Sequence, residues 1–155
     1  MYLENLTLHT AIEMSGAIIA IMVAYLLILL NSRNRGSSFN YSISAALLAM
    51  GFLDSIHAMM PPGNSFVWFH SCASLLGGIF FASIWLPDKM SSPLNKYLPL
   101  LALTLVIMIG VLSLVLPSQV PLMIYVRDFT LFSKFLNIIS GLMMYLAAIK
   151  LYLTK

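Results

Sequence analysis

Residues 97–116 decide the fold class, because they read YLPLLALTLVIMIGVLSLVL and contain no charged side chain. An α-helix rises about 1.5 Å per residue, so ~20 residues cover the ~30 Å hydrocarbon core of a bilayer. Inside lipid a helix satisfies its own backbone hydrogen bonds, whereas a barrel strand would alternate apolar and polar residues. This run does not alternate, so it predicts a membrane-spanning helix.

Four more apolar runs of similar length flank this stretch. Together the runs predict helices over about residues 8–30, 41–60, 66–86, 97–116 and 129–152. The breaks between them are rich in Pro, Gly, Asn and Ser, which are typical of turns. Residues 1–155 are therefore predicted to form a single all-α domain, a polytopic membrane bundle of five transmembrane helices.

The composition agrees with this interpretation. The chain is 61% hydrophobic and 8% charged, whereas soluble domains are roughly 45–50% apolar and about 25% charged. A soluble enzyme and a coiled coil are thus excluded. The one cysteine, Cys72, excludes an internal disulfide and a Cys-rich zinc site. The net charge of +3 is too small and too scattered for a nucleic-acid surface, so the expected partner is the lipid bilayer.

Basic residues predict the orientation of the bundle, since cytoplasmic loops carry an excess of Lys and Arg. One side of the predicted bundle holds Arg33, Arg35, Lys89, Lys96, Lys150 and Lys155. The other side holds Arg127, with Lys134 just inside the last helix, where it either neutralises a carboxylate or extends to the membrane surface. We therefore expect the N-terminus outside and the C-terminus in the cytoplasm. The last helix has no Gly or Pro stop signal, so it either continues into a further module or ends at the membrane surface.

Ionisable residues within the predicted spans form a small group at their outward ends. Each costs ~2.5–3.5 kcal/mol or more in a membrane helix, so such residues are candidates for function. The group consists of His9, Glu13, Asp54, His57 and His70. The i,i+4 spacing of the first pair and the i,i+3 spacing of the second place each pair on one helix face. A short loop joins the second and third helices, so their outward ends must be neighbours.

Three imidazoles and two carboxylates at one depth are typical of a transition-metal site, with Zn, Cu or Fe as the ion. We predict that His9, His57 and His70 bind the metal and that Glu13 or Asp54 completes the ligand set. The other carboxylate would orient a histidine through its second ring nitrogen. A metal-free polar network and unrelated interfacial residues are the alternatives.

Two patterns predict how the helices pack. Ser74-x-x-x-Gly78 in the third helix is a pair of small residues that lets helices approach closely. Ser133, Asn137 and Gly141 form an i,i+4 stripe that is expected to face the bundle.

The hairpin from residue 51 to residue 70, GFLDSIHAMMPPGNSFVWFH, resembles the MASE-type membrane-associated sensor domains of bacterial signalling proteins. The opening HTAIE of residues 9–13 resembles the start of the same kind of region, and the resemblance covers about the first ninety residues. It implies a multi-pass sensor in the bacterial inner membrane that is not itself an enzyme. It further implies a homodimer that relays its signal through the last helix to a cytoplasmic module fused C-terminally, a histidine kinase or a diguanylate cyclase.

Other functions remain open at this point. A metal with three histidines and an open position could activate water in a membrane hydrolase of lipid amides or esters, with Ser71 or Ser74 assisting. Two histidines from different helices could instead hold haem, although the carboxylates would then be unexplained. A transporter is disfavoured, since no polar path continues to the cytoplasmic end and no inverted repeat is present.

Overall fold

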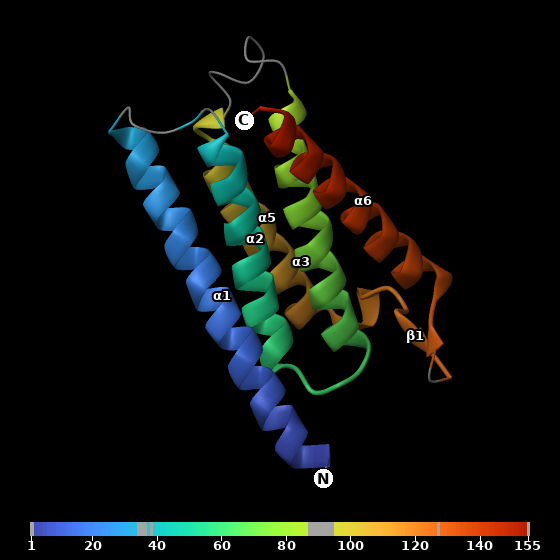
Figure 1. Cartoon of the computed structure of the whole chain (residues 1–155). Helices are drawn as coiled ribbons and strands as arrows, with labels where there is room; N and C mark the ends of the chain where they lie inside the picture. Colours follow the sequence, from blue (N-terminus) through green and yellow to red (C-terminus); the bar gives the residue numbers. More distant parts are fainter. Residues whose placement is uncertain (1, 34–36, 38, 87–94, 127, 155) are drawn as a thin grey trace.

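The computed structural model describes residues 2–33, 37, 39–86, 95–126 and 128–154, with side chains from residue 7 onward. Five long helices form a bundle, with a short hairpin beside one end (Figure 1). The elements are α1 (Tyr2–Ser32), α2 (Asn40–Met59), α3 (Asn64–Ala82), η1 (Ser83–Trp85), α5 (Leu98–Val115), η2 (Pro117–Gln119), β1 (Ile124–Tyr125), β2 (Asp128–Phe129) and α6 (Leu131–Leu153).

All five predicted spans coincide with helices that are long and apolar enough to cross a membrane, so the predicted fold class is confirmed. The helix ends differ from the predicted bounds by one to six residues, and the starts of α1 and α6 have clear causes. Helix α1 begins at Tyr2, because neither Gly nor Pro interrupts the chain before the apolar run starts. Helix α6 begins at Leu131, because the Thr130 side chain caps it by accepting a hydrogen bond from the Ser133 N–H at 3.2 Å. The predicted start, Phe129, lies in β2 instead.

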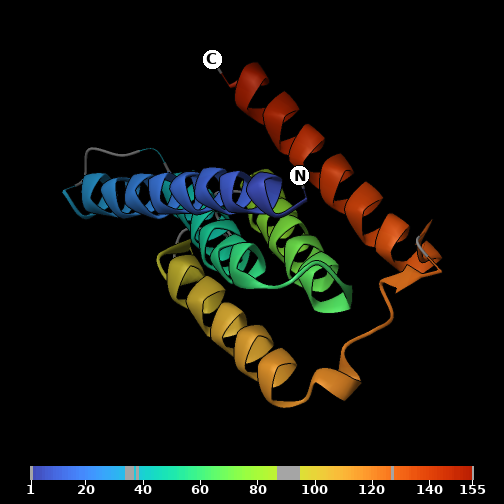
Figure 2. The same ribbon diagram turned by 90° about the horizontal axis from the view of Figure 1, so that it is seen from below.

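Helices α2 and α3 form the interior of the bundle. Buried residues make up 56% of the apolar window of α2 and 50% of that of α3, against 11% for both α1 and α6. Helices α1 and α5 pack on α2, and α6 packs on α3, so α1 and α6 lie on separate flanks (Figures 1 and 2). The core between the inner helices is rich in alanine and includes Ala45, Ala46, Ala49, Leu53, Phe69 and Ala73.

Small residues bring α6 close to α3. A Cβ atom added at Gly78 would lie 3.0 Å from the backbone oxygen of Ser140, which agrees with the predicted close packing. Ser133 and Ser140 are buried, but Gly141 is exposed, so the predicted stripe is wrong at its last position. Ser140 follows Ser133 by seven residues, which return a helix to within about 20° of the starting direction. Gly141 follows Ser133 by eight residues, which leave it about 80° away.

The linker between α5 and α6 is fixed to the start of α3 by one side chain. Asn64 donates from Nδ2 to the Pro121 carbonyl at 2.8 Å and accepts from the Met123 N–H at 2.6 Å. The linker continues into the antiparallel hairpin β1–β2, in which Ile124 pairs with Phe129. As a result, α6 starts at the same end of the bundle at which α2 ends and α3 begins (Figure 1). We call this end of the bundle, where the predicted histidines lie, the histidine end.

Four of the basic residues used to predict the orientation, Arg35, Lys89, Arg127 and Lys155, lie outside the described residues. The predicted orientation of the termini therefore stays a prediction.

Candidate functional site

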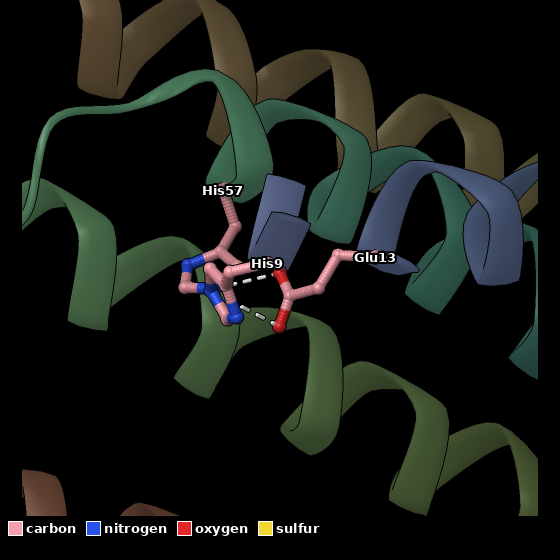
Figure 3. Close-up of side chains that lie close together, drawn as sticks. All are labelled: His9, Glu13 and His57. Atoms are coloured by element: carbon pink, nitrogen blue, oxygen red, sulfur yellow. Dashed lines mark ion pairs between the residues drawn. The ribbon is translucent and has the colours of Figure 1, made fainter. Parts of the chain in front are cut away.

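Glu13 lies at the centre of a cluster at the histidine end (Figure 3). One carboxylate oxygen is 3.5 Å from Nε2 of His9, one turn earlier on α1, and the other is 3.0 Å from Nε2 of His57 on α2. His57 is 3% exposed. One ligand atom from each of the three residues lies within 4.8 Å of the others. Two packed helices thus bring two imidazoles and one carboxylate close enough to share an ion.

The hydrogen bond on the far side of His57 fixes its proton. Nδ1 lies 2.6 Å from the backbone carbonyl of Phe66, on the first turn of α3. A carbonyl oxygen only accepts, so Nδ1 must be the donor and must carry a hydrogen. In neutral imidazole the other nitrogen, Nε2, is then unprotonated and points a lone pair at the Glu13 carboxylate. Two acceptors facing each other at 3.0 Å require a proton or a cation between them.

Several atoms of the site lack hydrogen bonds. Nε2 of His9, Oε2 of Glu13 and Oδ1 of Asp54 are shielded from solvent and have no hydrogen-bond partner among the residues that the structure describes. Each of these atoms lies within ion-pair distance of a neighbouring acid or imidazole group, but none of these contacts is a hydrogen bond. A buried polar atom without a partner costs roughly 1–3 kcal/mol. A cation bound by His9, Glu13 and His57 would offset that cost at His9 and Glu13.

The two remaining predicted residues form a second pair beside the cluster. Nδ1 of His70 lies 3.4 Å from Oδ1 of Asp54. The His70 ring centroid is 5.0 Å from that of His57, and the His70 side chain is 51% exposed. The structure thus gathers all five predicted residues at one end but brings only three into a common ligand set. Asp54 contacts His70, which lies outside the set of three, so the predicted orienting role of the second carboxylate stays a prediction.

A cavity of about 450 Å³ extends from this cluster toward α6. Its lining comes from α1, α2, α3, β2 and α6 and consists of His9, Glu13, His57, Phe66, Val67, His70, Phe129, Ser133, Lys134 and Asn137. The predicted polar stripe of α6 thus reaches the site through Ser133 and Asn137. The aromatic wall formed by Phe66 and Phe129 was not predicted, because a phenylalanine in an apolar segment has no distinguishing pattern.

Lys134 pairs with an acid outside the cluster. Its Nζ donates to Oδ2 of Asp128 at 3.0 Å, so it neutralises neither Glu13 nor Asp54. The other Asp128 oxygen accepts from the Phe129 N–H at 2.7 Å. The Lys134 hydrogen bond first, and the Phe129 bond second, hold the pKa of Asp128 below its ordinary value.

Lys134→Met is expected to move the titration of Asp128 upward, toward the ordinary aspartate pKa of about 3.9. The lowered pKa means that this pair stabilises the fold above the pKa of the unfolded chain. That contribution is lost as the pH falls through the folded pKa. The carboxyl ¹³C shift of Asp128, followed by NMR from neutral to acid pH, measures both midpoints. An unchanged midpoint in the variant would show that the ion pair does not form in solution.

Five membrane-length helices with a partly buried acid and imidazole cluster at one end define a polytopic membrane domain with a polar site at that end of the bundle. The family of membrane-associated sensor domains called MASE3 matches residues 2–155, and the chain belongs to this family. It is therefore a membrane-associated sensor domain and a multi-pass protein of the inner membrane. The match includes α5 and α6, beyond the first ninety residues that carried the resemblance. No curated protein and no solved structure matches the chain.

Proposed function

We propose that this sensor domain detects a divalent transition metal, or a ligand bound to one, through His9, Glu13 and His57. The observation that carries the proposal is the pair of acceptors, Nε2 of His57 and the Glu13 carboxylate, held 3.0 Å apart while Nδ1 of His57 is occupied by a carbonyl. A metal ion between them satisfies both lone pairs and offsets the burial of the carboxylate.

The donor set suits Zn, Cu or Fe. Imidazole nitrogen with carboxylate oxygen is a common ligand combination for these ions. A metal-bound histidine usually donates its other N–H to a carbonyl or a carboxylate, as His57 does to Phe66. Three protein ligands leave a fourth position open for an exogenous ligand. Here that position would face the cavity.

The route to an output passes through α6. The same cavity is lined by His9, Glu13 and His57 on one side and by Ser133 and Asn137 of α6 on the other. A ligand shifts a conformational equilibrium only if it binds one state better. Occupancy of the cavity would therefore favour one position of α6, through a small shift or rotation. We expect α6 to pass this shift to a cytoplasmic kinase or cyclase module in a homodimer.

The two alternatives receive less support. Ser71, a candidate helper for hydrolysis, is fully buried and accepts a hydrogen bond from Asn137 at 3.1 Å, so it is not placed as a nucleophile. Haem held by His9 and His57 would require iron between their ring nitrogens, where the Glu13 carboxylate contacts both.

The test is elemental analysis of the whole chain, purified in detergent, together with an absorption spectrum. We expect about one transition-metal ion per chain, and we expect His57→Ala to abolish it. His70→Ala is the matched variant and should retain the metal, because His70 lies outside the set of three. Wild-type protein without stoichiometric metal would contradict the proposal and leave a metal-free polar network. A Soret band would show that the site binds haem instead of a metal ion. Equal loss of metal in His57→Ala and His70→Ala would add His70 to the ligand set.

A further inference from the structure

The cavity is far larger than an ion requires. Its volume of about 450 Å³ lies in the range of small-molecule sites, which is roughly 300–1,000 Å³. Three apolar side chains, Phe66, Val67 and Phe129, line it beside the polar groups. It extends between α1 and α6, which pack on different neighbours. An organic molecule can therefore occupy the space that the ligand set does not fill.

Ser133 offers that molecule a hydrogen-bond donor. The residue is 1% exposed, and its Oγ has no hydrogen-bond partner among the described residues. Serines in helices often donate to the carbonyl four residues earlier. Ser140 on the same helix does so, with Oγ 2.7 Å from the Leu136 oxygen. Ser133 lacks such a bond and lines the cavity, so its hydroxyl is available to an occupant.

Two acceptors line the same cavity as this donor. Asn137 uses its Nδ2 group for bonds to Ser71 Oγ at 3.1 Å and to the Ser133 carbonyl at 2.9 Å, which leaves Oδ1 to accept. His70 turns Nδ1 toward Asp54, which leaves Nε2. The cavity can therefore serve a head group that accepts a hydrogen bond and, in its reduced form, donates one.

In the metal-free protein, the charges of the lining favour a neutral occupant. Lys134 is the single lysine or arginine in the described lining, and it is bound to Asp128 at 3.0 Å. Glu13 adds a carboxylate. A buried phosphate or carboxylate head group would need an unpaired cation to offset its desolvation. An anionic lipid or a fatty acid is thus disfavoured.

We propose that the cavity binds a neutral, membrane-dissolved amphiphile of the quinone and quinol class. A quinone carbonyl accepts from Ser133 Oγ, and a quinol hydroxyl donates to Oδ1 of Asn137 or to Nε2 of His70. The flat ring stacks against Phe66 or Phe129, and the apolar tail reaches lipid between α1 and α6. This site goes beyond the metal site and uses different side chains, so either one can fail without the other.

The test is a thermal-shift titration of the whole chain in lipid nanodiscs, with decylubiquinone as the probe. Each titration is run on EDTA-treated and on zinc-loaded protein, and zinc is counted in the same samples. Decylbenzene, which has the same tail without oxygens, and decanoate, which is anionic, are the matched compounds. We expect saturable stabilisation by decylubiquinone in both protein states, none by decylbenzene in either state, and none by decanoate in the EDTA-treated protein.

Two variants locate the binding. Ser133→Ala should raise the apparent Kd about tenfold, the effect of one lost hydrogen bond in a desolvated site. Ser140→Ala, at a buried serine of the same helix whose hydroxyl is already bonded, should leave the Kd unchanged. Val67→Trp should abolish binding by filling the cavity. Equal stabilisation by decylbenzene, or by decanoate in the EDTA-treated protein, would overturn the proposal, as would Ser133→Ala protein that binds like wild type. In either case the zinc count would still report separately on the metal site.

Discussion

Glu13→Gln is expected to weaken zinc binding by about 100-fold or more. Loss of an orienting partner of a metal ligand typically costs 10–100-fold, and loss of a ligand should cost at least as much. Glu13 is the one carboxylate in the described set of three, and it contacts both His9 and His57. Glutamine keeps the shape of the side chain but removes the charge that attracts the ion. Competition with a fluorescent zinc chelator, on the whole chain in detergent, measures the affinity.

Asp54→Asn is the matched control for this change. Asp54 contacts His70 at 3.4 Å and lies outside the ligand set. We therefore expect the zinc affinity of Asp54→Asn protein to fall less than tenfold. A fall of 10–100-fold would be expected only if this carboxylate oriented a metal-bound histidine. A larger loss in Asp54→Asn than in Glu13→Gln would move the metal centre to His70 and contradict the proposed set.

The sequence predicts much of this site because membrane burial makes polar residues conspicuous. In a lipid-facing segment an ionisable side chain is costly, so its presence is informative without any alignment. The i,i+4 spacing of His9 and Glu13 places them on one face, and the structure has them in contact. The short loop between α2 and α3 makes His57 and His70 neighbours, and their rings lie 5.0 Å apart.

The division of the five residues into a ligand set and a second pair could not be predicted. Asp54 and His57 share a face of α2 by spacing, yet they turn to different partners, His70 and Glu13. That choice depends on how α1 and α3 are rotated against α2. Rotation follows from the packing of many apolar side chains, and a sequence pattern does not specify it.

The roles of backbone groups and of very short elements also could not be predicted from the sequence pattern. The Phe66 carbonyl, which fixes the proton on His57, is a group that every residue carries. Strands β1 and β2 have two residues each, too few to show the alternation that identifies a strand. The hairpin nevertheless places Phe129 in the cavity wall. Prediction is thus strongest where chemistry is confined to rare side chains, and weakest where the backbone contributes.

The proposed relay also requires that α6 pack on the bundle and still be able to move. Buried residues make up only 11% of the apolar window of α6, and its main neighbour is α3. By contrast, α2 is enclosed by α1, α3 and α5. Small shifts of packed helices are a common form of switching. A helix with one principal packing partner can shift without disrupting the core, which suits α6 as the mobile element.

Gly78→Leu is therefore expected to detach α6 from α3 without affecting the metal set. A Cβ at this position would lie 3.0 Å from the Ser140 backbone oxygen and 3.2 Å from Cβ of Met143, and the backbone atom cannot turn away. Overpacking of this kind costs typically 1–3 kcal/mol and occasionally more, so we expect about 3 kcal/mol. For a chain of this size that corresponds to roughly 6–12 °C in Tm, measured by thermal unfolding in detergent.

Gly141→Leu provides the control, because a Cβ there meets nothing within 4 Å and the position is exposed. It should leave the Tm within about 2 °C of wild type, as surface substitutions usually do. In Gly78→Leu the zinc affinity should remain, since His9, Glu13 and His57 belong to α1 and α2. Decylubiquinone binding should be lost, since Ser133 and Asn137 move away with α6. Loss of zinc together with α6 would show that the metal set depends on this helix, and the proposed separation of detection from relay would fail.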